Sequence, residues 1–180
     1  MLTLTHDIIT LSTLVQTEIE QVRVWRNMPE ISSKMEYNQY ITQQQQEQWF
    51  DQLQHKNNCY YFIITVNHKK IGLAHLSDVN LTNKSAQVGL FIGENNFIGT
   101  GVALAASALL LQFAFDNLNL AILYAKVKNG NTTAINYNDF LGFRFDCAIN
   151  DGFNQYKITY QDYKTLQKKI HDLANVALHV

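Results

Sequence analysis

The stretch from Gln87 to Phe143 constrains the fold most, because it reads as strand, glycine-rich turn, helix and strand in succession. Ala86–Ile92 is apolar and strand-forming, and the turn Ile98–Ala103 leads straight into the alanine-rich helix Leu104–Phe115. The next strand is expected at Ala121–Val127. Strands joined through a helix lie parallel, so this unit predicts a parallel pair within the sheet.

The rest of the chain supplies helices and antiparallel strands. A first helix is expected from Thr13 to Asn27, before Pro29, and a second begins after Thr42, which forms a capping box with Gln45. The other expected elements are strands at Cys59–Val66 and Ile71–Asp78, a helix at Thr132–Leu141, strands near Phe143–Ile149 and Phe153–Tyr160 around the turn Asn150-Asp151-Gly152, and a helical tail from Tyr160 to about Ile170. This order predicts an α/β fold with a mixed sheet and helices on both faces.

The glycine-rich turn at Ile98–Ala103 is a candidate anion site. At the start of a helix, unpaired backbone N–H groups and the positive end of the dipole point towards a bound anion. The turn is too short for a P-loop, lacks the Gly-Lys-Ser/Thr ending, and does not have the three-glycine dinucleotide spacing. Neither of these common nucleotide-binding loops explains it.

The ordered set of strand, loop, helix, strand, asparagine block and Gly-Phe pair resembles the GCN5-related N-acetyltransferases. The family loop is usually written Gln/Arg-x-x-Gly-x-Gly/Ala, and here Gly101 and Ala103 match while Ile98 stands at the Gln/Arg position. Asn131–Ile135 resembles the family's Asn-x-x-Ala-Ile block, and Gly142-Phe143 follows at the family's distance. The resemblance extends from about residue 6 to about residue 165. It implies a central mixed sheet of about seven strands with a splayed parallel strand pair.

The resemblance implies acetyl-CoA as the acetyl donor. Its pantetheine arm would lie between the splayed strands, against the main chain of Phe91 and Ile92. The residues expected to surround its pyrophosphate are Ile98, Gly99, Thr100, Gly101, Val102 and Ala103. Asn131, which most simply caps its helix, and Asn138 are the other two expected donor-binding residues.

The catalytic residues are where this chain departs from the family. Many members carry a Tyr seven positions after the asparagine, but here that position is Asn138 and Tyr137 lies one residue earlier. Gln87 stands where many members have a Glu, and an amide does not accept a proton as a carboxylate does. We therefore take His75 as the candidate base and Tyr137 as the candidate proton donor, with Asp78 as a further candidate base. The alternatives are that Tyr137 is a packed core residue and His75 a partly buried strand residue.

The acceptor half is expected in the first helix and the loop after it. Arg26, Asn27 and Tyr37 are the candidate acceptor-binding residues, because Arg pairs with a diphosphate and Tyr packs on a base or sugar. The pattern Val24–Glu30 is similar to that of amino-sugar-nucleotide N-acetyltransferases of the pseudaminic-acid type. Trp-Arg-Asn also occurs in enzymes that acetylate ribosomal-protein N-termini. The alternative for Arg26 is a surface salt bridge.

Composition limits the class of protein. The length of 180 residues predicts a single domain over residues 1–180. The net charge of −1 gives no reason to expect nucleic acid or a membrane as partner. The N-terminus lacks a basic and an apolar leader region, so cytoplasm is the expected location. Cys59 and Cys147 are then expected to be reduced core thiols. No metal is expected, and apolar strand edges make a homodimer plausible.

Together these observations predict an acetyl-CoA-dependent N-acetyltransferase that works by direct attack in a ternary complex. The preferred acceptor is a primary amine on a nucleotide-linked amino sugar, and a protein N-terminus or a polyamine are alternatives. A non-catalytic domain that binds acyl-CoA is the alternative from a different class, and the absent Glu and Tyr keep it open.

Overall fold

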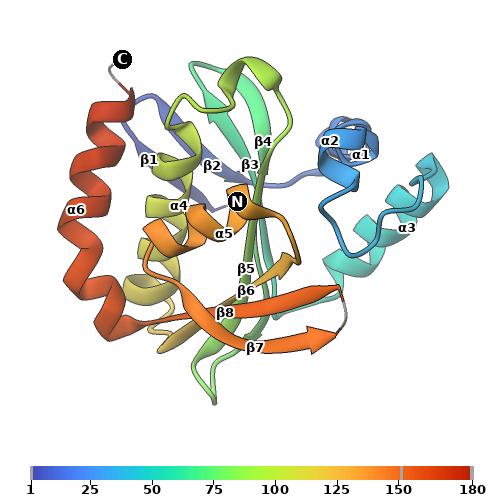
Figure 1. Cartoon of the computed structure of the whole chain (residues 1–180). Helices are drawn as coiled ribbons and strands as arrows, with labels where there is room; N and C mark the ends of the chain where they lie inside the picture. Colours follow the sequence, from blue (N-terminus) through green and yellow to red (C-terminus); the bar gives the residue numbers. More distant parts are fainter. Residues whose placement is uncertain (1, 151, 179–180) are drawn as a thin grey trace.

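The computed structural model describes residues 2–150 and 152–178, and an eight-stranded sheet forms its centre (Figure 1). Across the sheet the strands are ordered β1-β2-β3-β4-β5-β6-β8-β7. Their bounds are β1 Thr3–His6, β2 Ile9–Thr13, β3 Tyr60–Val66, β4 Lys69–Asn80, β5 Ser85–Ile92, β6 Ile122–Lys128, β7 Arg144–Asn150 and β8 Phe153–Thr159. Only β5 and β6 are parallel among these described strands. The predicted mixed sheet is confirmed, with one strand more than the seven or so expected.

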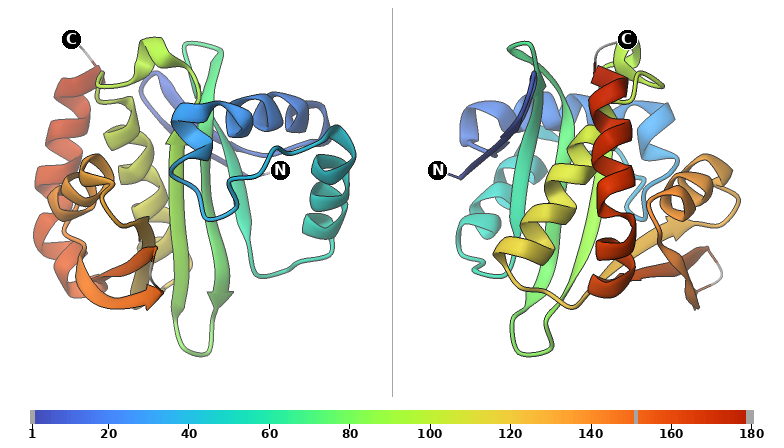
Figure 2. Two further views of the ribbon diagram at one scale, coloured as in Figure 1. Left: turned by 45° about the vertical axis from the view of Figure 1, so that its right-hand side comes forward. Right: turned by 90° about the vertical axis from the view of Figure 1, so that its left-hand side faces the viewer.

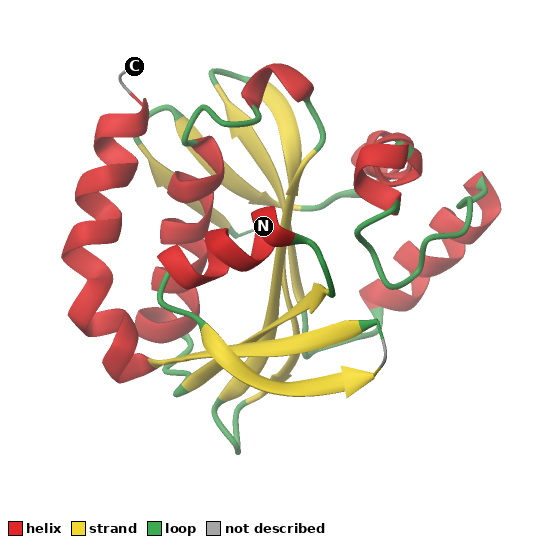
Figure 3. Ribbon diagram, viewed as in Figure 1, coloured by secondary structure: helices red, strands yellow, loops and turns green. Residues whose placement is uncertain are grey.

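The helices pack on both faces of the sheet, as predicted (Figures 1, 2 and 3). Their bounds are α1 Ile19–Asn27, α2 Pro29–Ser32, α3 Gln43–Gln54, α4 Val102–Gln112, α5 Thr132–Phe140 and α6 Tyr160–Leu178, with short turns of other helix types at Gln16–Glu18, Asn95–Phe97 and Phe113–Asn117. The pair α4 and α6 covers one face, and α1 to α3 lie on the opposite side. We call the second face the α1–α3 face.

Each face has its own hydrophobic cluster. The larger cluster joins the strands to the apolar helix α4 and to α6, with Phe62, Leu76 and Leu123 among its fully buried members. The smaller cluster lies under α1 and α3, where Trp25 and Ile63 are completely buried. Because side chains alternate along a strand, these two clusters also show which face each strand residue occupies.

The first hairpin and the start of the first helix differ from the sequence prediction. The helix predicted from Thr13 begins at Ile19, and Thr13 is instead the last residue of β2, opposite Phe62 of β3. Ile9 and Leu11 alternate with polar residues and are fully buried, which is the period of a half-buried strand. Long-range pairing with β3 therefore outweighs helix propensity at this end of the chain.

Other differences are small. Cys147 lies exposed on the edge strand β7, so only Cys59, which is half-buried, comes close to the expected core thiol. The predicted turn Asn150-Asp151-Gly152 falls between the end of β7 at Asn150 and the start of β8 at Phe153, and Asp151 lies outside the described residues. The helical tail extends past Ile170 to Leu178.

The parallel strands β5 and β6 are splayed. Their pairing consists of Ser85 with Ile122, Ala86 with Leu123 and Gln87 with Tyr124. Beyond this point β5 stays paired with β4 as far as Ile92, while β6 stays paired with β8 as far as Lys128. The two strands therefore diverge, and alternate backbone groups of β5 after Gln87 face the space between them. The expected splayed pair is confirmed.

Candidate active site

The glycine-rich loop leads into α4 with its backbone groups open. Gly99 and Gly101 both have positive φ angles, 81° and 79°, a conformation that glycine adopts without steric cost. Gly101 is the N-cap of α4 and offers no side chain to the first N–H groups of the helix, so these groups are open to an anion. Ile98 is 61% exposed beside the loop. The residues from Ile98 to Ala103 thus have the geometry expected of a phosphate-binding loop.

The two asparagines of α5 have mainly local partners. Asn131 caps the helix, because its side chain accepts a hydrogen bond of 3.3 Å from the Ala134 N–H. The Asn138 amide donates to the Ala134 carbonyl at 2.8 Å. The capping role of Asn131 is confirmed, whereas donor binding by either asparagine stays a prediction.

The Tyr137 side chain links α5 to α4 through hydrogen bonds. Its hydroxyl donates to the Ala103 carbonyl at 2.8 Å and lies 2.7 Å from Ser107 Oγ, which then acts as the donor. Burial raises the pKa of Tyr137 far above its ordinary value. A phenol that is already bonded to the helix backbone is poorly placed to protonate a leaving group. The packed-residue alternative for Tyr137 therefore fits the structure better than the proton-donor role.

The His75 side chain lies on the α1–α3 face, and its ring covers Gly89 of β5. Its ring stacks on Tyr61, with centroids 4.9 Å apart, and pairs across the sheet with Gly89. A Cβ atom on Gly89 would overlap the His75 ring, so the missing side chain makes room for the imidazole next to the gap between β5 and β6. Burial and then the Arg26 guanidinium lower the pKa of His75 to about 4. The imidazole is therefore neutral at physiological pH but only weakly basic.

Arg26 lies at the C-terminal end of α1 and has few partners. One guanidinium nitrogen donates to the Tyr37 carbonyl at 3.4 Å, whereas Nε is buried and has no hydrogen-bond partner among the described residues. Burial lowers the pKa of Arg26. The expected alternative of a surface salt bridge is not found within the described residues. A partly buried cation with an unused donor suits an anionic ligand.

Asn27 and Tyr37 shape the loop between α2 and α3. The Asn27 side chain bonds both backbone groups of Ile41, accepting from its N–H at 2.8 Å and donating to its carbonyl at 2.9 Å. Tyr37 is 50% exposed, and its hydroxyl lies 3.5 Å from the Gln45 amide. Asn27 therefore holds the loop in place, and the side chain of Tyr37 is half exposed to solvent.

The same loop reaches across to β6. Lys126 forms an ion pair with Glu36, and the Lys128 ammonium donates to the Ser33 carbonyl at 2.9 Å. Both lysines belong to the part of β6 that has diverged from β5. The loop thus covers the gap from the α1–α3 face, and the two lysines add positive charge there.

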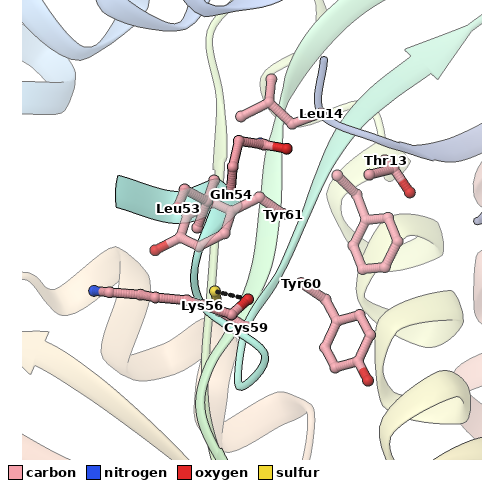
Figure 4. A pocket seen from close by; sticks show the side chains of 9 residues that line it. Thr13, Leu14, Leu53, Gln54, Lys56, Cys59, Tyr60 and Tyr61 are labelled. Carbon is pink, nitrogen blue, oxygen red and sulfur yellow. Dashed lines mark hydrogen bonds between the residues drawn. The ribbon is translucent and has the colours of Figure 1, made fainter. Parts of the chain in front are cut away.

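Two neighbouring hollows open near the C-terminal end of α3. The larger hollow has a volume of about 180 Å³, and both Tyr60 and Tyr61 line it. Their side chains point to opposite sides of β3 (Figure 4). Tyr60 packs on Phe113, on the opposite face of the sheet. Cys59 lines this hollow, and burial raises the pKa of its thiol, which disfavours the reactive thiolate form.

The smaller hollow, of about 100 Å³, lies closer to the splayed strands. Trp49, Tyr61, Ser77 and Asp78 are among its lining residues. Trp49 and Tyr61 meet edge to face at 5.3 Å, and Ser77 is the strand partner of Gln87. This hollow therefore places Ser77 and Asp78 one strand away from the point where β5 and β6 separate, with Trp49 and Tyr61 further from that point.

The structure brings together some predicted residues and adds others. His75 and Arg26 are electrostatic neighbours, and Arg26 donates to the Tyr37 carbonyl, whereas Tyr137 is bonded to Ala103 and Ser107 of α4. Sequence reasoning did not single out Tyr61 and Gly89 as site residues. Their signal is the strand register, because Tyr61, His75 and Gly89 are successive partners across β3, β4 and β5.

Neither a metal cluster nor a membrane-spanning helix is found in the described residues. They contain no group of three or more His, Cys, Asp or Glu side chains arranged to hold a metal ion. Among them, no helix is both long and apolar enough to cross a membrane.

Comparison with known proteins adds a family and several relatives. The family model described as the acetyltransferase (GNAT) domain matches residues 9–144. Acetyltransferase PseH from Campylobacter jejuni is 30% identical over 118 residues, which cover 66% of this chain and 71% of that protein. Spermidine N(1)-acetyltransferase from Escherichia coli is 28% identical over 104 residues, which cover 58% of this chain and 55% of that protein.

Solved structures share the fold. A spermidine N-acetyltransferase from Vibrio cholerae, in complex with CoA and spermine, has a TM-score of 0.79 at 21% identity and covers 88% of this chain and 99% of its own. The ribosomal L7/L12 α-N-protein acetyltransferase RimL, in complex with coenzyme A, has a TM-score of 0.76 at 13% identity and covers 88% of this chain and 98% of its own. At these identities the likeness concerns the fold alone.

Proposed function

The chain belongs to the GNAT family of acetyltransferases, and on this premise we propose that it transfers an acetyl group from acetyl-CoA to a primary amine on a nucleotide-linked amino sugar. The reaction proceeds by direct attack of the amine on the thioester, with both substrates bound together. The observation that carries this proposal is the gap between β5 and β6, with the glycine loop at one end and Arg26 on the face above it.

The donor half rests on backbone geometry. The glycine loop and the free N–H groups at the start of α4 suit a pyrophosphate, and they need no side-chain cation for it. The open edge of β5 after Gln87 offers alternate N–H and carbonyl groups to the amide groups of a pantetheine arm. An N–H on this edge would also stabilise charge that develops on the thioester oxygen. Acetyl-CoA therefore fits the groups that are present.

The groups near the gap support the proposal of direct attack. A mechanism with an acetylated enzyme requires an activated nucleophile, and Cys59 has a thiol pKa raised by burial. The other cysteine, Cys147, lies on the edge strand β7. Positioning of the amine against the thioester then supplies much of the rate.

The choice of acceptor rests on protonation and charge. With a pKa near 4, His75 is a weak base, so the enzyme favours an amine that is already partly neutral at physiological pH. Arg26 and Lys128 add positive charge on the α1–α3 side of the gap, and neither forms an ion pair within the described residues, whereas Lys126 is paired with Glu36 and Asp78 lines the nearby hollow. A sugar-linked diphosphate gains from these charges, whereas a polyamine is repelled by them.

A panel of acceptors tests the function. Release of free CoA thiol would be followed with UDP- and dTDP-linked 4-amino sugars, a peptide with N-terminal Ala or Ser, and spermidine. We expect one amino-sugar nucleotide to give a kcat/KM at least tenfold above the others. A higher value with spermidine or the peptide would overturn the acceptor assignment. No turnover with any amine, together with CoA binding by calorimetry, would favour the non-catalytic alternative.

A further inference from the structure

The transfer releases a thiolate that needs a proton, and the residues expected to supply it are engaged elsewhere. Tyr137 donates to the Ala103 carbonyl, and Asn138, at the family's Tyr position, donates its amide to Ala134. Protonation by a nearby acid accelerates departure of such a group, so a hydroxyl close to the sulfur is of value. This hydroxyl must lie near the end of the pantetheine arm of acetyl-CoA. The arm can extend only as far as the point where β5 and β6 begin to pair.

Tyr124 lies at that point. It is the β6 partner of Gln87 in the last residue pair before the strands diverge. Its neighbours Leu123 and Ala125 are buried in the larger cluster on the α4 face, so Tyr124 projects to the α1–α3 face. Gln87 projects to the same face, because Phe91, four residues along β5, packs beside Trp25 there. The two side chains therefore flank the closed end of the gap.

The Tyr124 hydroxyl is available. It has no hydrogen-bond partner among the described residues, and the side chain is only half-buried. The residue paired with Tyr124 on β8 is Lys157, and the Lys157 ammonium forms an ion pair with Asp146 at 2.8 Å. Tyr61, on the same face, is further from the closed end, because it lies on β3, two strands from β5, where it stacks on His75.

We propose that Tyr124 is a catalytic residue that gives its phenolic proton to the sulfur of the departing CoA. This inference rests on the proposed function, because it assigns a role within the same reaction. The amine nitrogen attacks the carbonyl carbon, the C–N bond forms, and the C–S bond breaks with its electron pair on sulfur. The sulfur takes the proton of Tyr124, and the nitrogen, positively charged after the attack, loses a proton to the tyrosinate through a water molecule to which the Gln87 amide can hydrogen-bond. The products are the amide and free CoA thiol, and the phenol is restored.

The first test replaces the hydroxyl alone. Tyr124→Phe should lower kcat by roughly 100-fold, the lower end of the range for a general acid, while the Kd for acetyl-CoA measured by calorimetry changes less than twofold. Tyr156→Phe is the matched control, because Tyr156 lies on the adjacent strand and belongs to the opposite-face cluster. Its kcat should stay within twofold of wild type. Unchanged kcat in Tyr124→Phe, or parallel losses of kcat and acetyl-CoA affinity, would overturn the proposal.

The second test does not depend on turnover. Replacing Tyr124 by 3-fluorotyrosine keeps the hydroxyl, makes it more acidic, and provides a fluorine nucleus. We expect its NMR signal to shift on titration with CoA, and the same label at Tyr156 to stay in place. A Tyr124 signal that ignores CoA while calorimetry shows binding would place the residue away from the sulfur and overturn the proposal.

The two levels of inference fail separately. If wild-type protein turns over none of the amines, the proposed function fails, whatever the fluorine signal shows. If wild type is active and Tyr124→Phe matches it, the function stands and only the role of Tyr124 is lost. Circular dichroism melting of both variants checks that the fold is intact.

Discussion

At the residue scale, His75 links the site to the pH dependence of stability. Its pKa of about 4 in the folded protein is below the ordinary value of 6.5, so between these values the unfolded chain binds more protons. Stability should therefore be full above pH 6.5 and fall as the pH drops towards 4, by at most roughly 3 kcal/mol from this residue. Urea unfolding of wild type and His75→Gln at pH 7.5 and 4.5 measures the effect. Equal acid losses in the two proteins would show that His75 is not the source.

Arg26 carries the prediction about the acceptor at the same scale. Arg26→Ala should raise the KM for the preferred sugar nucleotide roughly tenfold or more, because charge-assisted hydrogen bonds contribute about 1.5–3 kcal/mol. The KM for acetyl-CoA should not change. Arg144→Ala is the control, since Arg144 lies on the edge strand β7 and pairs with Asp139 of α5. An Arg26→Ala enzyme with wild-type KM for the sugar nucleotide would contradict the diphosphate assignment.

At the scale of elements, the glycine loop predicts the affinity for the donor. Gly99→Ala should weaken acetyl-CoA binding about tenfold, because the loop must keep its φ of 81° and leave space for the pyrophosphate. Gly130→Ala is a close match, since Gly130 has φ 77° and a Cβ atom added at either glycine would meet no other atom within 4 Å. Calorimetry should show a loss only for Gly99→Ala. Equal affinities would remove the loop from the donor site.

The contact between α1 and the end of β5 predicts a stability effect. A Cβ atom on Gly93 would overlap the Trp25 ring, which is fully buried and donates from Nε1 to Glu94 at 3.1 Å. Gly93→Ala should therefore cost about 1–3 kcal/mol of unfolding free energy. Gly152→Ala is the control, because its nearest contact would be Asn150 Oδ1 at 3.6 Å. Thermal melts that do not separate the two variants would contradict this packing.

At the scale of the whole molecule, features set by local sequence were predictable. The β-α-β unit, the Asn131 cap and the Thr42 capping box depend on neighbouring residues, and the structure has all three. The β1–β2 hairpin was missed, because it depends on pairing with β3, far along the chain. Tyr137 was likewise a residue whose role follows from a contact with α4 rather than from its motif. The position of Tyr124 opposite Gln87 requires the register of a parallel pair, which no local pattern specifies.

The short seam between β5 and β6 has a mechanical consequence. It divides the sheet into two leaves, β1 to β5 and β6 with β8 and β7, hinged on three residue pairs. On the α1–α3 face, the ion pair of Lys126 with Glu36 and the hydrogen bond of Lys128 to Ser33 connect β6 to the loop between α2 and α3. We expect a small twist at these three pairs to change the width of the slot while the other strand pairs stay intact. Loss of the two lysine contacts should let the leaves part more easily on the α1–α3 face.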